Sequence, residues 1–142
     1  MKFRNILVAV DFSPASHHVM RAAVDMAKEW DAELTVAHVW QWPIVGVELP
    51  TAGQLIENVR VASEKQLATW TAEASQLAGK PVKSVLETGS PWDALVKVLE
   101  RGKHDLAIVG THGYSGLKHV LLGSVAEKVI RHAPCTVLVV RQ

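Results

Sequence analysis

The sequence has little cysteine, no long apolar run and almost no net charge, and each shortage excludes a class of protein. One cysteine, Cys135, rules out a disulfide framework, and we expect it to be a small core residue rather than a nucleophile. A net charge of +1 argues against a nucleic-acid surface. No stretch approaches the roughly 20 apolar residues of a membrane span, and the apolar residues before Asp11 are too few for a signal peptide. A cytoplasmic protein is expected.

Length and composition are those of an ordinary globular domain. Of the 142 residues, 49% are hydrophobic and 20% are charged, which is enough to bury a core without disulfides or metal. No segment is repeated or of low complexity. We therefore expect a single domain over residues 1–142.

Short apolar runs alternate with helical patterns along the chain. Five runs have the length and β-branched content of strands, at residues 6–10, 34–40, 82–87, 106–109 and 136–140. Between them, apolar residues recur three and four apart in helices that begin near residues 14, 55, 91 and 124. Residues 41–53 contain two prolines and two glycines and predict a long loop. The order βαβαβαβαβ predicts an α/β fold with a parallel sheet.

The third run decides the expected strand order. Residues 82–87 include polar side chains that the first and fourth runs lack, which places this strand at a sheet edge. The order 3-2-1-4-5 follows, with helices on both faces in a Rossmann-like arrangement. It sets Asp11, after the first strand, opposite Gly110, after the fourth, in a ligand-binding crevice. The Asp11 carboxylate could accept from ribose hydroxyls or approach a phosphate-bound Mg²⁺; alternatively, it serves only the start of the following helix.

A glycine-rich segment follows the fourth strand, with the spacing Gly110-x2-Gly113-x9-Gly123. Glycine lets backbone amides approach a ligand that a Cβ would hold away. Ser124 comes next, and with Glu127 it has the S-x-x-E form of a capping box at the start of a helix. Such a helix start presents unpaired N–H groups and a positive dipole end to a phosphate chain. The alternative is a surface loop that needs glycine only for its turns.

Two common nucleotide-binding motifs are absent. The first strand-to-helix turn, residues 11–14, contains no glycine, so neither the dinucleotide fingerprint nor the G-x-x-x-x-G-K-[ST] loop stands there. Gly110, Gly113 and Gly116 have the wrong first interval for that fingerprint. The sequence therefore disfavours both a Rossmann dehydrogenase and a P-loop NTPase.

Together these features resemble the universal stress protein family, specifically its ATP-binding branch. The likeness runs from ILVAVDFSPAS at the start to IVGTHGYSGLKHVLLGSVAEKVIRHAPCTVLVV at the end. It implies a fold of the adenine nucleotide alpha hydrolase type that binds ATP, with Mg²⁺ near Asp11 and no metal site of the protein alone. Thr136 departs from the family pattern, in which proline often follows the cysteine. By position, the resemblance implies nucleotide binding by Ala9, Val10, Asp11, Val39, Val109, Gly110, Gly113, Gly123, Ser124, Val125 and Ala126.

No residue pattern indicates a catalytic or metal site. The seven histidines are scattered, without acidic or cysteine partners at metal-ligand spacing. His112 and Lys118 could touch phosphate but are expected to be solvated surface residues. Ser124 has no base near it in sequence, so phosphate binding or capping is expected rather than nucleophilic attack. Any hydrolysis of ATP should therefore be slow.

The last strand predicts how the chain associates. In the order 3-2-1-4-5 it forms a sheet edge, yet residues 137–140 carry no charge or proline, and such an edge associates unless it is covered. We predict a homodimer through Thr136 to Val140, as the resemblance also implies. The predicted function is a nucleotide-responsive stress or regulatory factor with an unknown protein partner. The alternatives are a slow ATPase or nucleotidyl transferase on this fold, and a nucleotide-free interaction protein.

Overall fold

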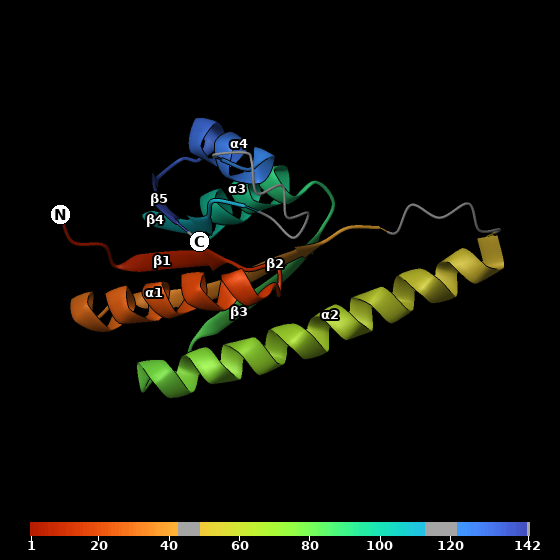
Figure 1. Ribbon diagram of the computed structural model, residues 1–142, viewed down its shortest axis with the longest axis horizontal. Coiled ribbons are helices and arrows are strands. Elements are labelled where there is room, and N and C mark those ends of the chain that lie inside the picture. The colour runs from red at the N-terminus through yellow and green to blue at the C-terminus, as the bar shows by residue number, and fades with distance from the viewer. Residues whose placement is uncertain (43–48, 113–121, 142) are drawn as a thin grey trace.

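The computed structural model describes residues 1–42, 49–112 and 122–141, and it has three layers (Figure 1). The middle layer is a sheet of strands β1 (Asn5–Ala9), β2 (Glu33–Trp40), β3 (Lys83–Thr88), β4 (Leu106–Gly110) and β5 (Thr136–Val140). The helices are α1 (Pro14–Trp30), α2 (Leu49–Ala78), α3 (Pro91–Arg101) and α4 (Ser124–His132). Helices α1 and α2 cover one face of the sheet, and α3 and α4 cover the other (Figure 1).

The sheet is parallel throughout, with the strand order β3-β2-β1-β4-β5. Strands β1 and β4 lie inside it and are buried because helices cover both of their faces. Strand β3 is an edge on which Lys83 and Ser84 are exposed. Both the predicted strand order and the predicted α/β fold class are confirmed.

The sheet separates two hydrophobic cores, because successive side chains of a strand point to opposite faces. Ile6 and Val8 pack toward α1 and α2 in one core. Leu7 packs toward α3 and α4 in the other. Each strand is thus held from both sides, which fixes the positions of the strand ends.

Helix α2 begins earlier than the sequence indicates. Residues 41–53 were expected to be a loop, but the helix starts at Leu49 and contains Gly53, while residues 43–48 lie outside the described part of the chain. Pro50 falls in the first turn, where its missing N–H is not needed. Gly53 weakens a helix interior by only about 1 kcal/mol. The prediction from proline and glycine content was therefore wrong at residues 49–53.

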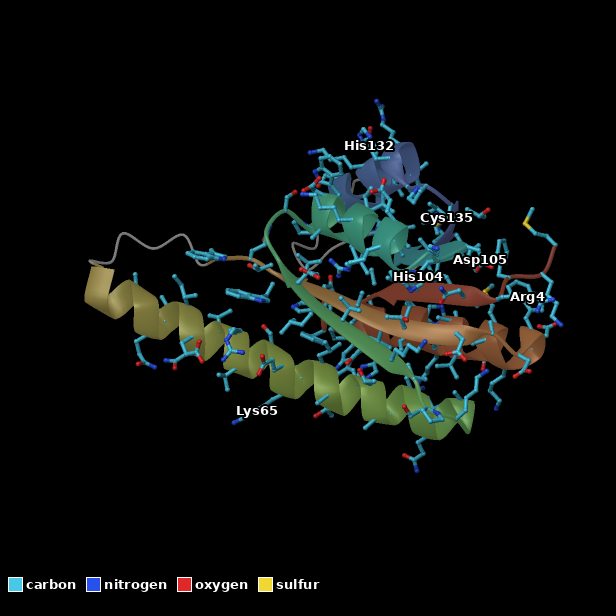
Figure 2. All side chains as sticks on the ribbon, turned by 180° about the vertical axis from the view of Figure 1, so that it is seen from behind. Arg4, Lys65, His104, Asp105, His132 and Cys135 are labelled. Carbon is cyan, nitrogen blue, oxygen red and sulfur yellow. The ribbon has the colours of Figure 1, made fainter. Side chains whose placement is uncertain are left out.

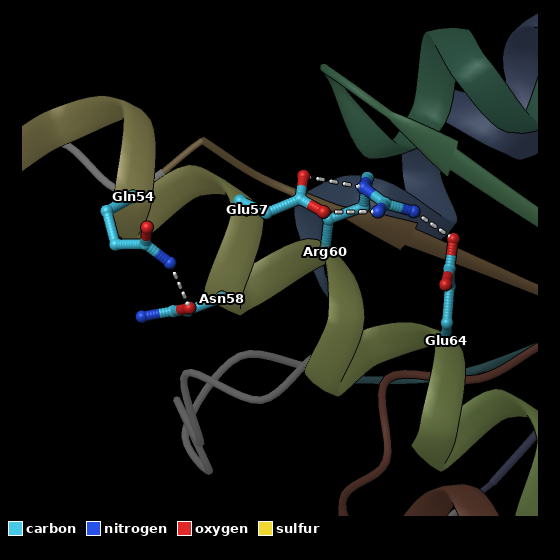
Figure 3. A network of polar contacts seen from close by, with 5 residues as sticks. All are labelled: Gln54, Glu57, Asn58, Arg60 and Glu64. Atoms are coloured by element: carbon cyan, nitrogen blue, oxygen red, sulfur yellow. Dashed lines mark hydrogen bonds and ion pairs between the residues drawn. The ribbon is translucent and has the colours of Figure 1, made fainter.

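The N-terminal half of α2 extends beyond the sheet, while its core contacts come from Leu67, Trp70 and Ala74 (Figure 1). Side-chain pairs along the helix support this half. The Arg60 guanidinium lies between Glu57 and Glu64, at positions i−3 and i+4 (Figure 3). Among the described helices, none, α2 included, has the length and apolarity of a membrane span.

Hydrogen bonds close the amino end of the sheet, where Arg4 and Asp105 lie near each other (Figure 2). The Asp105 carboxylate accepts the backbone N–H groups of Arg4 and Asn5, both at 2.9 Å. The Asn5 side chain in turn donates to the carbonyl of Gly102 at 2.9 Å. These bonds tie the start of β1 to the turn before β4, at the end of the sheet opposite the cavity described next.

Candidate functional site

A cavity of about 660 Å³ lies at the carboxyl ends of β1, β2 and β4. Its volume is typical of small-molecule sites. Strands β1 and β4 are neighbours in the sheet. The helix after β1, α1, covers one face of the sheet, and the helix after β4, α4, covers the other face. The cavity therefore lies where the strand order reverses, as expected for ligand binding by an open α/β sheet.

The predicted site residues converge on this cavity. Those that line it are Ala9, Val10, Asp11, Val39, Val109, Gly110, Gly123, Ser124, Val125 and Ala126. Gly113 lies outside the described residues, as do Lys118 and the rest of residues 113–121. The fold thus brings four separate segments into one wall, while their roles toward a ligand stay predictions.

Asp11 stabilises the start of α1 from the cavity wall. Its Oδ1 accepts the Ser13 N–H at 3.0 Å and the hydroxyls of Ser13 and Ser16, each at 2.5 Å. These bonds let the chain turn sharply through Phe12, whose φ of 64° is left-handed. Among the described residues, Oδ2 has no hydrogen-bond partner. One oxygen of the carboxylate therefore stabilises the helix start. The other is available as a hydrogen-bond acceptor at the cavity.

The N-terminus of α4 also faces the cavity, although its cap differs from the expected one. Gly123 is the N-cap, with φ −67° and ψ 157°, and Ser124 is the first helical residue without a side-chain capping bond. The capping box predicted from Ser124 and Glu127 was therefore wrong. The Gly123 N–H donates to the Thr111 carbonyl at 2.6 Å, which holds Gly123 outside the helix and moves the cap back by one residue.

This correction strengthens the anion-binding character of the helix start. A serine at the cap would use its oxygen on a first-turn N–H. With glycine there, the N–H groups of Ser124, Val125 and Ala126 have no partner within the helix. All three residues line the cavity, at the positive end of the helix dipole. Glu127 pairs instead with Arg131 at 2.9 Å, one turn further along.

Aromatic side chains also line the cavity. His38 lies with Nδ1 2.8 Å from the Val10 carbonyl, and because a carbonyl only accepts, we assign the proton to Nδ1. Burial lowers the pKa of His38, so the ring is neutral at pH 7 and presents Nε2 as an acceptor. Trp40 at the end of β2 and Trp92 in the first turn of α3 line the same cavity. Flat neutral walls of this kind suit a planar ring.

Several cavity residues that come from helices were not among the predicted site residues. Val59 and Ser63 on α2, Trp92 on α3 and Lys128 on α4 all line the cavity. Apolar residues at helical spacing, such as Val59, identify a buried face without showing whether that face covers the sheet or a cavity. For Trp92, the position directly after the third strand was a usable signal, since all parallel strands end at the same edge of a sheet.

The polar side chains of the described residues include no group of three or more histidine, cysteine or acidic residues that could hold a metal. His17 lies 3.1 Å from Glu73 and stacks on Trp70, with 3.9 Å between ring centroids. His132 packs against Trp92. Cys135 is a free, partly buried thiol whose pKa is raised by burial, which keeps it protonated and poorly nucleophilic.

Comparison with known proteins places the whole chain in one group. The profile of the universal stress protein family matches residues 2–141. Universal stress protein MJ0531 of Methanocaldococcus jannaschii is 32% identical over 141 residues, which cover 99% of this chain and 83% of that protein. Similar proteins therefore extend over nearly all of this sequence.

Solved structures agree with the sequence matches. The structure of hypothetical protein MJ0577 is 27% identical, with a TM-score of 0.89 over 100% of this chain and 98% of that one. A universal stress protein in complex with cAMP is 26% identical, with a TM-score of 0.70 over 99% and 98% of the two chains. The similarity in fold therefore agrees with the match to the family profile.

Proposed function

The chain belongs to the universal stress protein family, and we propose that it binds an adenine nucleotide, ATP in particular, and acts as a nucleotide-responsive regulatory protein. The observation that carries this proposal is the division of one cavity into two chemically different parts. Uncharged walls that include His38 and Trp40 at the end of β2 suit a base, and the open start of α4 suits phosphates. The related protein solved with cAMP, itself an adenine nucleotide, supports the same ligand class.

Magnesium fits this site as a companion of the phosphates. Asp11 has an oxygen without a partner among the described residues, and carboxylate oxygen is a ligand that Mg²⁺ accepts. One carboxylate is typical of Mg²⁺ that is held mainly by nucleotide phosphates and water. Asp11 would hold the ion, which would in turn neutralise charge on the phosphate chain.

We propose that hydrolysis is slow, because acceleration of phosphoryl transfer needs a positioned water and strong charge stabilisation. Asp11 is the only carboxylate among the described lining residues, and two serines already hold it. Phosphate release well above that of a Gly123→Val variant would favour the ATPase alternative instead.

Nucleotide binding is tested on the purified protein in two steps. Mass spectrometry after denaturation should detect a co-purified adenine nucleotide, and titration calorimetry with Mg·ATP should give heat with a stoichiometry of one per chain. Gly123→Val should weaken binding at least about tenfold, because its side chain blocks approach to the α4 amides. Gly53→Ala on α2, where a Cβ meets nothing within 4 Å, is the matched control and should bind normally. Absence of both nucleotide and heat would contradict the proposal and favour a nucleotide-free interaction protein.

A further inference from the structure

Lys128 is the only lysine or arginine among the described residues that line the cavity. It lies one helical turn after Ser124 on α4, and helical side chains lean toward the N-terminus of their helix. A Lys128 side chain that leans in this direction would bring its ammonium toward the open amides of the first turn. The other charged residue among the described lining residues is Asp11, of opposite sign, so Lys128 supplies the positive charge of the described wall.

The ammonium of Lys128 rests on an aromatic ring. Its Nζ lies 5.7 Å from the centroid of the Trp92 ring, and Trp92 lines the cavity too. Lys128 is solvent-exposed, and a cation–π contact at an exposed site is weak. A charge-assisted hydrogen bond to a phosphate oxygen is stronger. The Trp92 ring therefore keeps the ammonium beside the cavity, but the contact is too weak to compete with an anion for it.

We propose that Lys128 makes the site select nucleotides by phosphate number, by moving from Trp92 to the outer phosphates of ATP. This inference rests on the nucleotide binding proposed above and names the ligand subclass. The uncharged walls and the first-turn amides act on the base and on the first phosphate, which AMP and ATP share. The additional phosphates of ATP carry further negative charge, and Lys128, the only lysine or arginine among the described lining residues, would add to Mg²⁺ in balancing it.

Calorimetry with ATP and with AMP tests the selection. Both nucleotides are titrated with Mg²⁺ into the wild type and into Lys128→Gln, which removes the charge but keeps a long side chain and helix propensity. We expect ATP binding to weaken about tenfold and AMP binding by less than about twofold. The ATP loss should shrink at high salt, since screening already weakens the charge pair in the wild type. Lys128→Arg should keep the preference for ATP.

A matched lysine controls for net charge. Lys97 on α3 is similarly exposed but pairs with Asp93 at 2.7 Å and does not line the cavity, so Lys97→Gln should leave both affinities unchanged. Equal weakening of ATP and AMP in Lys128→Gln, or no weakening, would overturn the selection while leaving nucleotide binding intact. Failure of the wild type to bind either nucleotide would overturn the proposed function, and this inference with it.

Discussion

The Asp11 carboxylate stabilises the start of α1 and also lines the cavity. Its Oδ1 accepts three hydrogen bonds from Ser13 and Ser16, which is enough to explain an acidic residue before α1 without any ligand. Its second oxygen and its negative charge are what a Mg²⁺–nucleotide complex would use. The two roles predicted for Asp11, at the helix start alone or also toward a ligand, are separated by a pair of substitutions.

Asp11→Asn should keep the fold and lose the ligand function. Asparagine retains an acceptor at Oδ1 but has no charge, so we expect the free energy of unfolding to fall by less than about 1 kcal/mol. Asp11→Ala removes the acceptor as well and should cost about 1–3 kcal/mol. Urea unfolding measures the first effect, and calorimetry with Mg·ATP should show weaker binding in both variants. Unchanged Mg·ATP binding in Asp11→Asn would mean that the carboxylate serves the helix alone.

At the scale of elements, strands were easier to predict than the surroundings of the cavity. Residues 106–109 are uninterrupted apolar because β4 is covered on both faces, and the polar residues of β3 reflect its edge position. These two patterns place β3 at an edge and β4 inside the sheet, and the family resemblance implied the full strand order. The start of α2 was missed because Pro50 and Gly53 read as loop residues, whereas a first turn tolerates proline and a 30-residue helix tolerates one glycine.

Site residues could be predicted where they adjoin strand ends or the glycine segment. Asp11 and Gly110 follow from the strand order, since parallel strands end at one edge, whereas Ala9 was predicted from the family resemblance. Ser63 and Lys128 reach the cavity only through the packing of α2 and α4, which no local pattern encodes. The α4 cap was mispredicted for a similar reason, because the Gly123–Thr111 hydrogen bond joins residues 12 positions apart.

The corner between α3 and β4 buries a histidine. His104 is 9% exposed, and its Nε2 lies 3.4 Å from the Thr35 hydroxyl. Gly102 is required beside it, because a Cβ there would overlap the imidazole ring. Burial lowers the pKa of His104, as does Lys83, while the Val98 and Leu99 backbone and Asp105 oppose the shift. The folded protein therefore holds this ring in its neutral form.

Acid should destabilise the protein through this corner. The folded-state pKa of His104 lies below the unfolded value of about 6.5, so the unfolded chain binds the proton more readily. The free energy of unfolding is then highest above that value and falls as the pH drops through it toward the folded pKa. His38 acts in the same direction, because burial also lowers its pKa.

His104→Gln should reduce this pH dependence. Urea unfolding between about pH 7.5 and about pH 5.5 should show a smaller loss of stability than in the wild type, since one of the two buried imidazoles is gone. An equal loss of stability in wild type and His104→Gln would show that the buried ring does not titrate in this range.

At the scale of the whole molecule, the two edges of the sheet differ in a way that bears on assembly. The β3 edge carries exposed Lys83 and Ser84. The β5 edge presents Val137 to Val140, all partly exposed, and Ile130 on the neighbouring helix α4 is 46% exposed. The Val140 carbonyl accepts the Thr111 N–H and so points toward β4. Because the backbone groups of successive strand residues point to alternate sides, the N–H and carbonyl of Val139 point away from the sheet. An uncharged edge with outward donors and acceptors suits pairing with a second copy.

We propose that the protein is a homodimer joined by two β5 strands across a twofold axis. Multi-angle light scattering should give the mass of two chains for the wild type. Val139→Asp places a charge between the two β5 strands. Val139→Pro removes an outward N–H without breaking the bond between Val140 and Thr111. Each variant should give monomer, or insoluble protein where the apolar edge stays uncovered. Ser84→Asp adds the same charge to the opposite edge and should remain a dimer, because that edge is already polar. A monomeric wild type, or a well-behaved dimer of both Val139 variants, would place the contact elsewhere, and the uncovered β5 edge would then need another partner.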